Sequence, residues 1–277
     1  MNQEEGLHGP LLDSGRMVID EFAKTDYDGK SVNRIHVDIK HMSVQCRKDY
    51  YAYRKSKASL RNTPILCSHT GISMSYPTLD QWIQFVAKNP DEKISKDIQV
   101  GEYYTHEQSI NLCREDLVEI YHSNGLVGIQ LDEKRIMGNL AFKELKKKRE
   151  EGTNKEKKYI YAKAIWANIF CAIDELEHAG ITDKKVWDLF AIGSDFDGLI
   201  NHLDSFESAA KMPELKATMS YFLQEPADIL LYESKPENKT YQLDTVAIKR
   251  LMKNYTPNEL VEKVFSGNVM QFLERYF

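Results

Sequence analysis

The sequence has few cysteines, no long apolar run and no excess of positive charge, and each shortage argues against a class of protein. Its four cysteines are widely spaced and form no Cys-x-x-Cys pair, so neither a thiolate zinc site nor a disulfide framework is indicated. No apolar stretch reaches the roughly 18–20 residues that span a bilayer. The net charge of −5 and the pI near 5.9 argue against nucleic acid or an anionic membrane as the main partner.

What remains is an ordinary globular composition, with 42% hydrophobic and 29% charged residues over 277 positions. That length suits one large domain or two small ones. The opening Met1-Asn-Gln-Glu-Glu has neither the basic segment nor the apolar run of a signal peptide. We therefore expect a cytoplasmic protein in a reducing compartment.

Short apolar runs alternate with helical patterns along the chain, which predicts parallel βα units and an α/β fold. We expect buried strands near 34–40, 64–67, 126–131 and 187–194. We expect helices near 11–23, 43–60, 79–88, 159–178 and 244–277, the last broken near 266–268, with loops and short helices over 203–240. A complete eight-stranded barrel needs about 250 residues and twice as many strands. The sequence therefore predicts one domain over 1–277, the second half of a TIM-type barrel with insertions near 74–120, 138–165 and 203–240.

The segment Ala191–Gly198, Ala-Ile-Gly-Ser-Asp-Phe-Asp-Gly, ends an apolar run with two carboxylates between glycines. A buried strand that stops on an acid is how barrel enzymes present a ligand or a base. An Asp-Gly turn is the alternative interpretation. A calcium loop does not fit, because the glycine spacing differs from that of an EF-hand.

Three further predicted strands also end on metal-ligand residue types: His41, His69 and Asp132. Side chains at the carboxyl ends of parallel strands meet on one face, so they could converge with Asp195. Imidazole with carboxylate suits zinc or manganese, which lower the pKa of bound water and supply a nucleophile. Each histidine could instead be a hydrogen-bonded residue at the edge of the core. The pair His36 and Asp38 offers a rival metal motif on the first strand.

These segments resemble the membrane dipeptidase (renal dipeptidase) family of zinc hydrolases, within the amidohydrolase superfamily. Residues 192–198, Ile-Gly-Ser-Asp-Phe-Asp-Gly, are similar to its Gly-x-Asp-Phe-Asp-Gly motif on the last barrel strand. Residues 37–43, Val-Asp-Ile-Lys-His-Met-Ser, resemble its fifth-strand motif, and Ser68-His69-Thr70 resembles its sixth-strand Ser-His-Ser. Gly6-Leu7 and the stretch from Tyr255 to Asn268 resemble flanking segments.

The resemblance implies a binuclear metal site with His41 and His69 on one ion. It implies that Asp195 is both a catalytic residue and a residue of the metal site, and that it handles a proton of the attacking water and the leaving amine. The family's first-strand His-x-Asp pair and its bridging glutamate precede the matched region, and no clamping arginine is evident in Thr70–Thr78. We assign Asp132, Asp197 and His202 to substrate binding.

Two classes of function remain open. The first is a zinc-dependent (or other divalent metal) hydrolase that cleaves small peptide or amide bonds with metal-activated water. The alternative is a non-catalytic half-barrel with a binding or assembly role. Because a half-barrel exposes sheet edges and apolar surface, both predict a homodimer or a partner that supplies an N-terminal half. Neither predicts nucleic acid or a membrane as partner.

Overall fold

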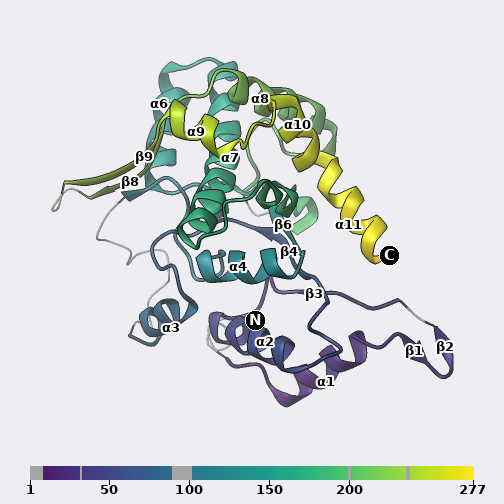
Figure 1. The fold of residues 1–277 in the computed structure, drawn as a ribbon. Helices are drawn as coiled ribbons and strands as arrows, with labels where there is room; N and C mark the ends of the chain where they lie inside the picture. The colour runs from purple at the N-terminus through teal and green to yellow at the C-terminus, as the bar shows by residue number, and fades with distance from the viewer. Residues whose placement is uncertain (1–8, 32, 89–101, 199–200, 235–237) are drawn as a thin grey trace.

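The computed structural model describes residues 9–31, 33–88, 102–198, 201–234 and 238–277 (Figure 1). Its centre is an all-parallel sheet in the order β3-β4-β6-β7. The strands are β3 (Val37–Asp38), β4 (Ile65–Thr70), β6 (Leu126–Ile129) and β7 (Phe190–Ile192). The predicted α/β fold with a parallel sheet is confirmed, while the half-barrel stays a prediction. The Gly6-Leu7 match lies outside the described residues.

Three long helices connect successive strands of this sheet: α2 (Val44–Ser56), α4 (Arg114–His122) and α7 (Asn154–His178). Each parallel pair therefore has a helical crossover, as such a sheet requires. Helix α2 begins where predicted, because the Ser43 side chain accepts a hydrogen bond from Cys46 N at 2.9 Å and caps the helix.

Helix α7 begins earlier than the predicted residue 159. Thr153 and Glu156 form a capping box that satisfies the backbone N–H groups at its start. All residues from Ile160 to Leu176 are buried, because the helix packs on β6 and on several neighbouring helices. A helix enclosed on all sides carries apolar residues all round, which explains its weak amphipathic pattern.

A second, antiparallel sheet was not predicted. Its order is β5-β8-β9, formed by β5 (Glu102–Tyr103), β8 (Ile229–Ser234) and β9 (Lys239–Leu243). It joins two of the predicted insertions across a long sequence separation. The expectation of loops and short helices over 203–240 was wrong, since the 13-residue α8 (Met212–Gln224) also lies there. Pro213 stands in the first turn of α8, where proline starts a helix instead of breaking it.

The apolar run before Asp195 was assigned to a strand too early. Lys184–Leu189 forms a 3-10 helix, and β7 begins only at Phe190. The Asp183 side chain caps this turn by accepting from Lys185 N at 2.7 Å. A short apolar run does not distinguish a buried strand from a buried helical turn.

The remaining elements surround these layers, and the β1–β2 hairpin projects from the body beside α1 (Figure 1). They are α1 (Asp13–Phe22), β1 (Asp26–Tyr27), β2 (Lys30–Ser31), α3 (Leu79–Lys88), α5 (Glu133–Ile136), α6 (Asn139–Glu151), α9 (Thr245–Leu251), α10 (Pro257–Glu262) and α11 (Asn268–Tyr276). A π-helical turn, Lys263–Gly267, joins α10 to α11 near the predicted break. Within the described ranges, no helix is long and apolar enough to cross a bilayer.

Candidate functional site

The structure brings His41, His69 and Asp195 together at the carboxyl end of the parallel sheet. His41 follows β3, His69 is the second-last residue of β4, and Asp195 follows β7. The rings of His41 and His69 have centroids 5.2 Å apart. His69 Nε2 lies 3.5 Å from Asp195 Oδ2. The predicted convergence is therefore a feature of this fold, while the roles of the three residues stay predictions.

Two glycines let the sheet curl tightly beneath this cluster. A Cβ on Gly193 would lie 2.0 Å from the Ser68 carbonyl oxygen, and one on Gly128 would lie 2.1 Å from the same atom. Strands β4 and β7 both pair with β6 and not with each other. Because Gly128 and Gly193 have no side chains, β4 and β7 can approach each other across β6. This approach brings the carboxyl ends of β4 and β7 close together.

The Asp195 carboxylate is fixed by its own turn and by β6. Its backbone has φ +55°, a left-handed conformation that aspartate tolerates better than most residues. Gln130 Nε2 donates to Asp195 Oδ2 at 2.9 Å. A Cβ on Gly198 would lie 2.4 Å from Asp195 Oδ1, so the glycine leaves room for the carboxylate. Both glycines of the predicted motif thus allow a close approach.

Buried charges set the electrostatics of the cluster. Burial lowers the pKa of His69; the Asp195 carboxylate opposes this shift and the Lys40 ammonium adds to it. Lys40 is 3% exposed, and its Nζ has no hydrogen-bond partner among the described residues. Burial lowers the pKa of Lys40 to about 8. At neutral pH a mostly protonated amine therefore lies beside the histidines, which disfavours a second cation there.

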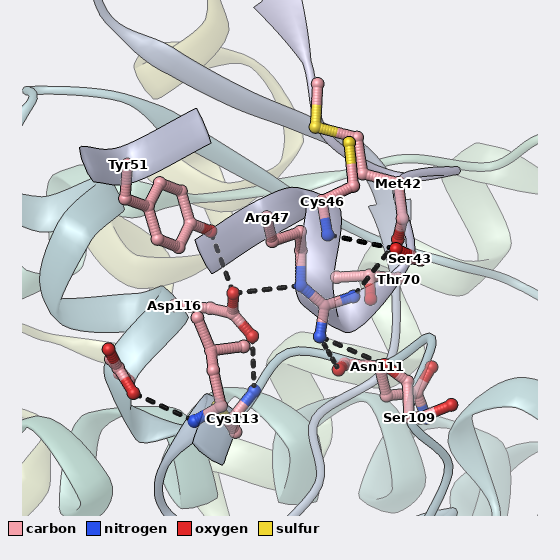
Figure 2. A network of polar contacts seen from close by, with 12 residues as sticks. Met42, Ser43, Cys46, Arg47, Tyr51, Thr70, Ser109, Asn111, Cys113 and Asp116 are labelled. Atoms are coloured by element: carbon pink, nitrogen blue, oxygen red, sulfur yellow. Dashed lines mark hydrogen bonds and ion pairs between the residues drawn. The ribbon is translucent and has the colours of Figure 1, made fainter. Parts of the chain in front are cut away.

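A buried ion pair fixes the segment that follows His41 (Figure 2). Arg47 Nε lies 3.0 Å from Asp116 Oδ1, with the two side chains 1% and 0% exposed. Arg47 also donates to the carbonyl oxygens of Ser109, at 3.0 Å, and Met42, at 3.5 Å. Burial alone would lower the pKa of Arg47, but the Asp116 carboxylate, together with Tyr51, Cys113 and Cys67, raises that pKa overall. The pair ties α2, α4 and the loop before α4 to the end of β3.

The rival pair His36 and Asp38 serves two separate contacts. Asp38 Oδ1 accepts from the backbone N–H groups of Lys40, at 3.0 Å, and Ser68, at 3.1 Å. The His36 ring packs edge-on against Phe272, Tyr276 and Phe277, with centroid distances of 6.1, 5.3 and 5.3 Å. Their contacts are structural, joining β3 to β4 and to the C-terminal helix.

The three residues assigned to substrate binding differ in their surroundings. Asp132 is buried, and its carboxylate accepts from Lys134 N at 2.8 Å and Asn201 N at 3.1 Å. It therefore caps α5 and holds the segment that contains His202, with which it forms a β-bridge. Asp197 and His202 are exposed. Substrate binding by these residues stays a prediction.

Sequence reasoning gave no separate role to Ser68, Gln130 and Lys40. Ser68 Oγ lies 2.8 Å from His69 Nδ1. Gln130 comes directly after the apolar run of β6, a position that the strand-end argument covers equally well. Lys40 was quoted only as part of a motif. These three residues could have been found by considering every polar residue at the predicted strand ends, and not only histidine and aspartate.

The cluster supplies the ligand types of a zinc site but not a complete set. Structural and catalytic zinc sites have at least three protein ligands. Within the described ranges, no group of three or more His, Cys, Asp and Glu side chains is arranged to hold a metal ion. Asp195 Oδ2 faces His69 Nε2 and Gln130, and the Lys40 charge lies nearby. The described residues do not fit a self-sufficient metal centre.

No protein-family model matches the chain, and no curated protein matches it. Among solved structures, it is similar to a metallopeptidase from Rhodobacter sphaeroides liganded with a phosphinate mimic of the dipeptide L-Ala-D-Ala, at 15% identity and TM-score 0.49. It is also similar to a dipeptidase described as a metallopeptidase of family M19, at 16% identity and TM-score 0.49.

These alignments cover 98% and 97% of this chain but only 50% and 52% of the two structures. The chain thus spans about half the length of the structures it matches. Similarity at this level supports no inference about activity. Any such inference has to rest on the geometry of the cluster itself.

Proposed function

We propose that this chain is one component of a metal-dependent hydrolase that cleaves small peptide or amide bonds. The observation that supports this is the convergence of His41, His69 and Asp195 at the carboxyl ends of parallel strands. Zinc is the expected ion, with the two imidazoles as its ligands from this chain. Because the described residues lack a complete ligand set, the further ligands in this proposal come from a partner chain.

In this proposal His41 and His69 would hold the ion, and a bound ion would supply an activated water molecule as the nucleophile. The residues of this chain orient groups and carry protons. Gln130 holds the Asp195 carboxylate in place, and Asp195 accepts a proton and returns it to the leaving amine. Burial lowers the pKa of His69 and so favours the neutral imidazole at pH 7. The neutral imidazole is the form of histidine that binds a metal.

The alternative is a non-catalytic half-barrel that serves for binding or assembly. One observation favours it: the buried Lys40 ammonium, which has no hydrogen-bond partner within the described ranges, contributes to lowering the pKa of His69. A positive charge in that position opposes a resident cation.

The test is catalysis by the assembly in which the chain occurs. The tagged chain is isolated from its native cells with whatever co-purifies, and is assayed on a dipeptide panel with zinc or manganese. We expect turnover that a chelator abolishes and that falls by a factor of about 100 or more in Asp195→Asn, since a proton-transfer group contributes on that order. The matched control is Asp28→Asn, an exposed aspartate in the turn between β1 and β2 with a similar left-handed backbone, φ +50°, which should retain turnover.

The recombinant chain alone should show negligible turnover, because it lacks ligands. Vigorous turnover by the chain alone, abolished in Asp195→Asn, would show that the ligand set is complete. Turnover in the assembly that is unaffected by Asp195→Asn would remove the site from the proposal.

A further inference from the structure

Ser68, His69 and Asp195 form a continuous line of polar contacts that does not involve His41. Ser68 Oγ lies 2.8 Å from His69 Nδ1. On the other side of the same ring, His69 Nε2 lies 3.5 Å from Asp195 Oδ2. A hydroxyl, an imidazole and a carboxylate in this order are the parts of an activated serine nucleophile. Here the hydroxyl meets Nδ1 and the carboxylate meets Nε2, the reverse of the usual assignment.

Adjacent residues on a regular strand point to opposite faces, so the contact between Ser68 and His69 needs an irregular strand. Strand β4 provides one, because its register with β6 shifts between Cys67 and Thr70. A bulge of this kind re-aims side chains at the end of a strand. The irregularity is what places both side chains within hydrogen-bonding distance.

The backbone of Ser68 is held from two directions. Its N–H donates to Asp38 Oδ1 at 3.1 Å. Its carbonyl oxygen lies against Gly128 and Gly193, where a Cβ would approach to 2.1 and 2.0 Å. The carboxylate at the other end of the line is held by Gln130. Both ends of the line are therefore fixed by neighbours that lie in, or directly after, other strands.

The line is also reachable. Ser68 is exposed, and the side chains of His69 and Asp195 are 16% and 23% exposed. The hydroxyl is thus available to a small substrate, while the base and the carboxylate are partly shielded from water.

We propose that in the metal-free chain Ser68 is the nucleophile of an acyl-transfer reaction, with His69 as its base and Asp195 as the orienting carboxylate. The substrate class is esters of small carboxylic acids. This activity goes beyond the proposed metal-dependent hydrolysis and needs no ion. The two activities use His69 differently: the serine reaction needs Nδ1 free to accept a proton from Ser68, whereas metal binding would use a ring nitrogen as a ligand.

The reaction proceeds in two balanced stages. Ser68 Oγ forms a bond to the ester carbonyl carbon and passes its proton to His69 Nδ1, while Nε2–H points to Asp195. The bond to the leaving oxygen breaks, and that oxygen takes the proton from His69. Water then attacks the acyl carbon and gives its proton to His69; the acyl–Oγ bond breaks, and Oγ takes that proton back. The products are the carboxylic acid and the alcohol.

The experiment uses the full chain after treatment with a chelator, with a fluorophosphonate probe and p-nitrophenyl acetate. We expect the probe to label Ser68, as located by mass spectrometry, and ester hydrolysis that the chelator does not reduce. Both should be lost in Ser68→Ala and His69→Gln. Asp195→Asn should reduce both by a factor of 10 or more, by analogy with the large losses at other serine triads, which reach about 10⁴. Asparagine also tolerates the left-handed backbone at this position.

The matched control is Ser56→Ala, which removes an exposed hydroxyl at the end of α2 and should change neither readout. Labelling of the unmodified chain does not depend on any variant folding, so absence of label on Ser68 would overturn the proposal. Label on Ser68 that persists in folded His69→Gln would overturn it as well. Metal-dependent dipeptide turnover that survives Ser68→Ala would still support the proposed function, so the two proposals fail separately.

Discussion

Arg47→Met should lower the free energy of unfolding by about 3–5 kcal/mol, because removal of one member of a buried ion pair leaves the other charge unpaired. Asp116 is 0% exposed, so its carboxylate cannot recover hydration in the folded state. Tyr51 OH, at 2.8 Å, and Cys113 N, at 3.0 Å, would remain as donors, but neither carries charge. Urea denaturation followed by circular dichroism measures the change.

The control for this variant is Arg16→Met. Arg16 pairs with Asp13 at 2.8 Å, but the two side chains are 36% and 94% exposed, and such surface pairs contribute about 0–1 kcal/mol. If Arg47→Met lowers the free energy of unfolding by less than about 1 kcal/mol, the buried pair contributes no more than a surface pair. The Asp116 carboxylate would then not need Arg47 to be stable in the core. The segment around Met42 would then need another explanation for its position.

Gly193→Ala should destabilise the chain by about 3 kcal/mol, at the upper end of the usual cost of overpacking a core. The new methyl group would meet the Ser68 carbonyl oxygen at 2.0 Å and Gly128 Cα at 2.9 Å. Both are backbone atoms, so no side chain can turn away and the strands themselves must separate. The same displacement moves His69 away from Asp195, so the predicted ester activity should fall too.

Gly267→Ala is the comparison variant, since its Cβ would lie 3.4 Å from the Glu262 carbonyl oxygen, a distance that needs little adjustment. Thermal or urea unfolding of both variants gives the difference. Equal stability of Gly193→Ala and the wild type would contradict the close approach of β4 and β7.

The parallel sheet could be predicted because its strands are short apolar runs with polar residues soon after them, as after Ile129 and Ile192. The antiparallel sheet could not. Its pairing of Glu102 with Glu233 joins segments far apart in the sequence, and neither has strict alternation. The 3-10 turn before Phe190 was missed for a related reason, because a short apolar run specifies burial and not backbone conformation.

For the site, the sequence indicated which residues lie at strand ends but not their separations. The 3.5 Å contact of His69 with Asp195 depends on how far the sheet curls, and that depends on the two glycines at 128 and 193. The contact of Ser68 with His69 depends on an irregularity in β4. A regular strand would have placed these neighbours on opposite faces.

The most direct test of the account is the metal stoichiometry of the full chain, measured by zinc titration calorimetry and elemental analysis. We expect the chain to bind at most about one ion, weakly, because two imidazoles leave a tetrahedral site incomplete. Binding should be lost in His41→Gln and in His69→Gln and kept in His202→Gln, the exposed control. Two tightly bound ions per chain, or binding that persists in both His41→Gln and His69→Gln, would contradict it.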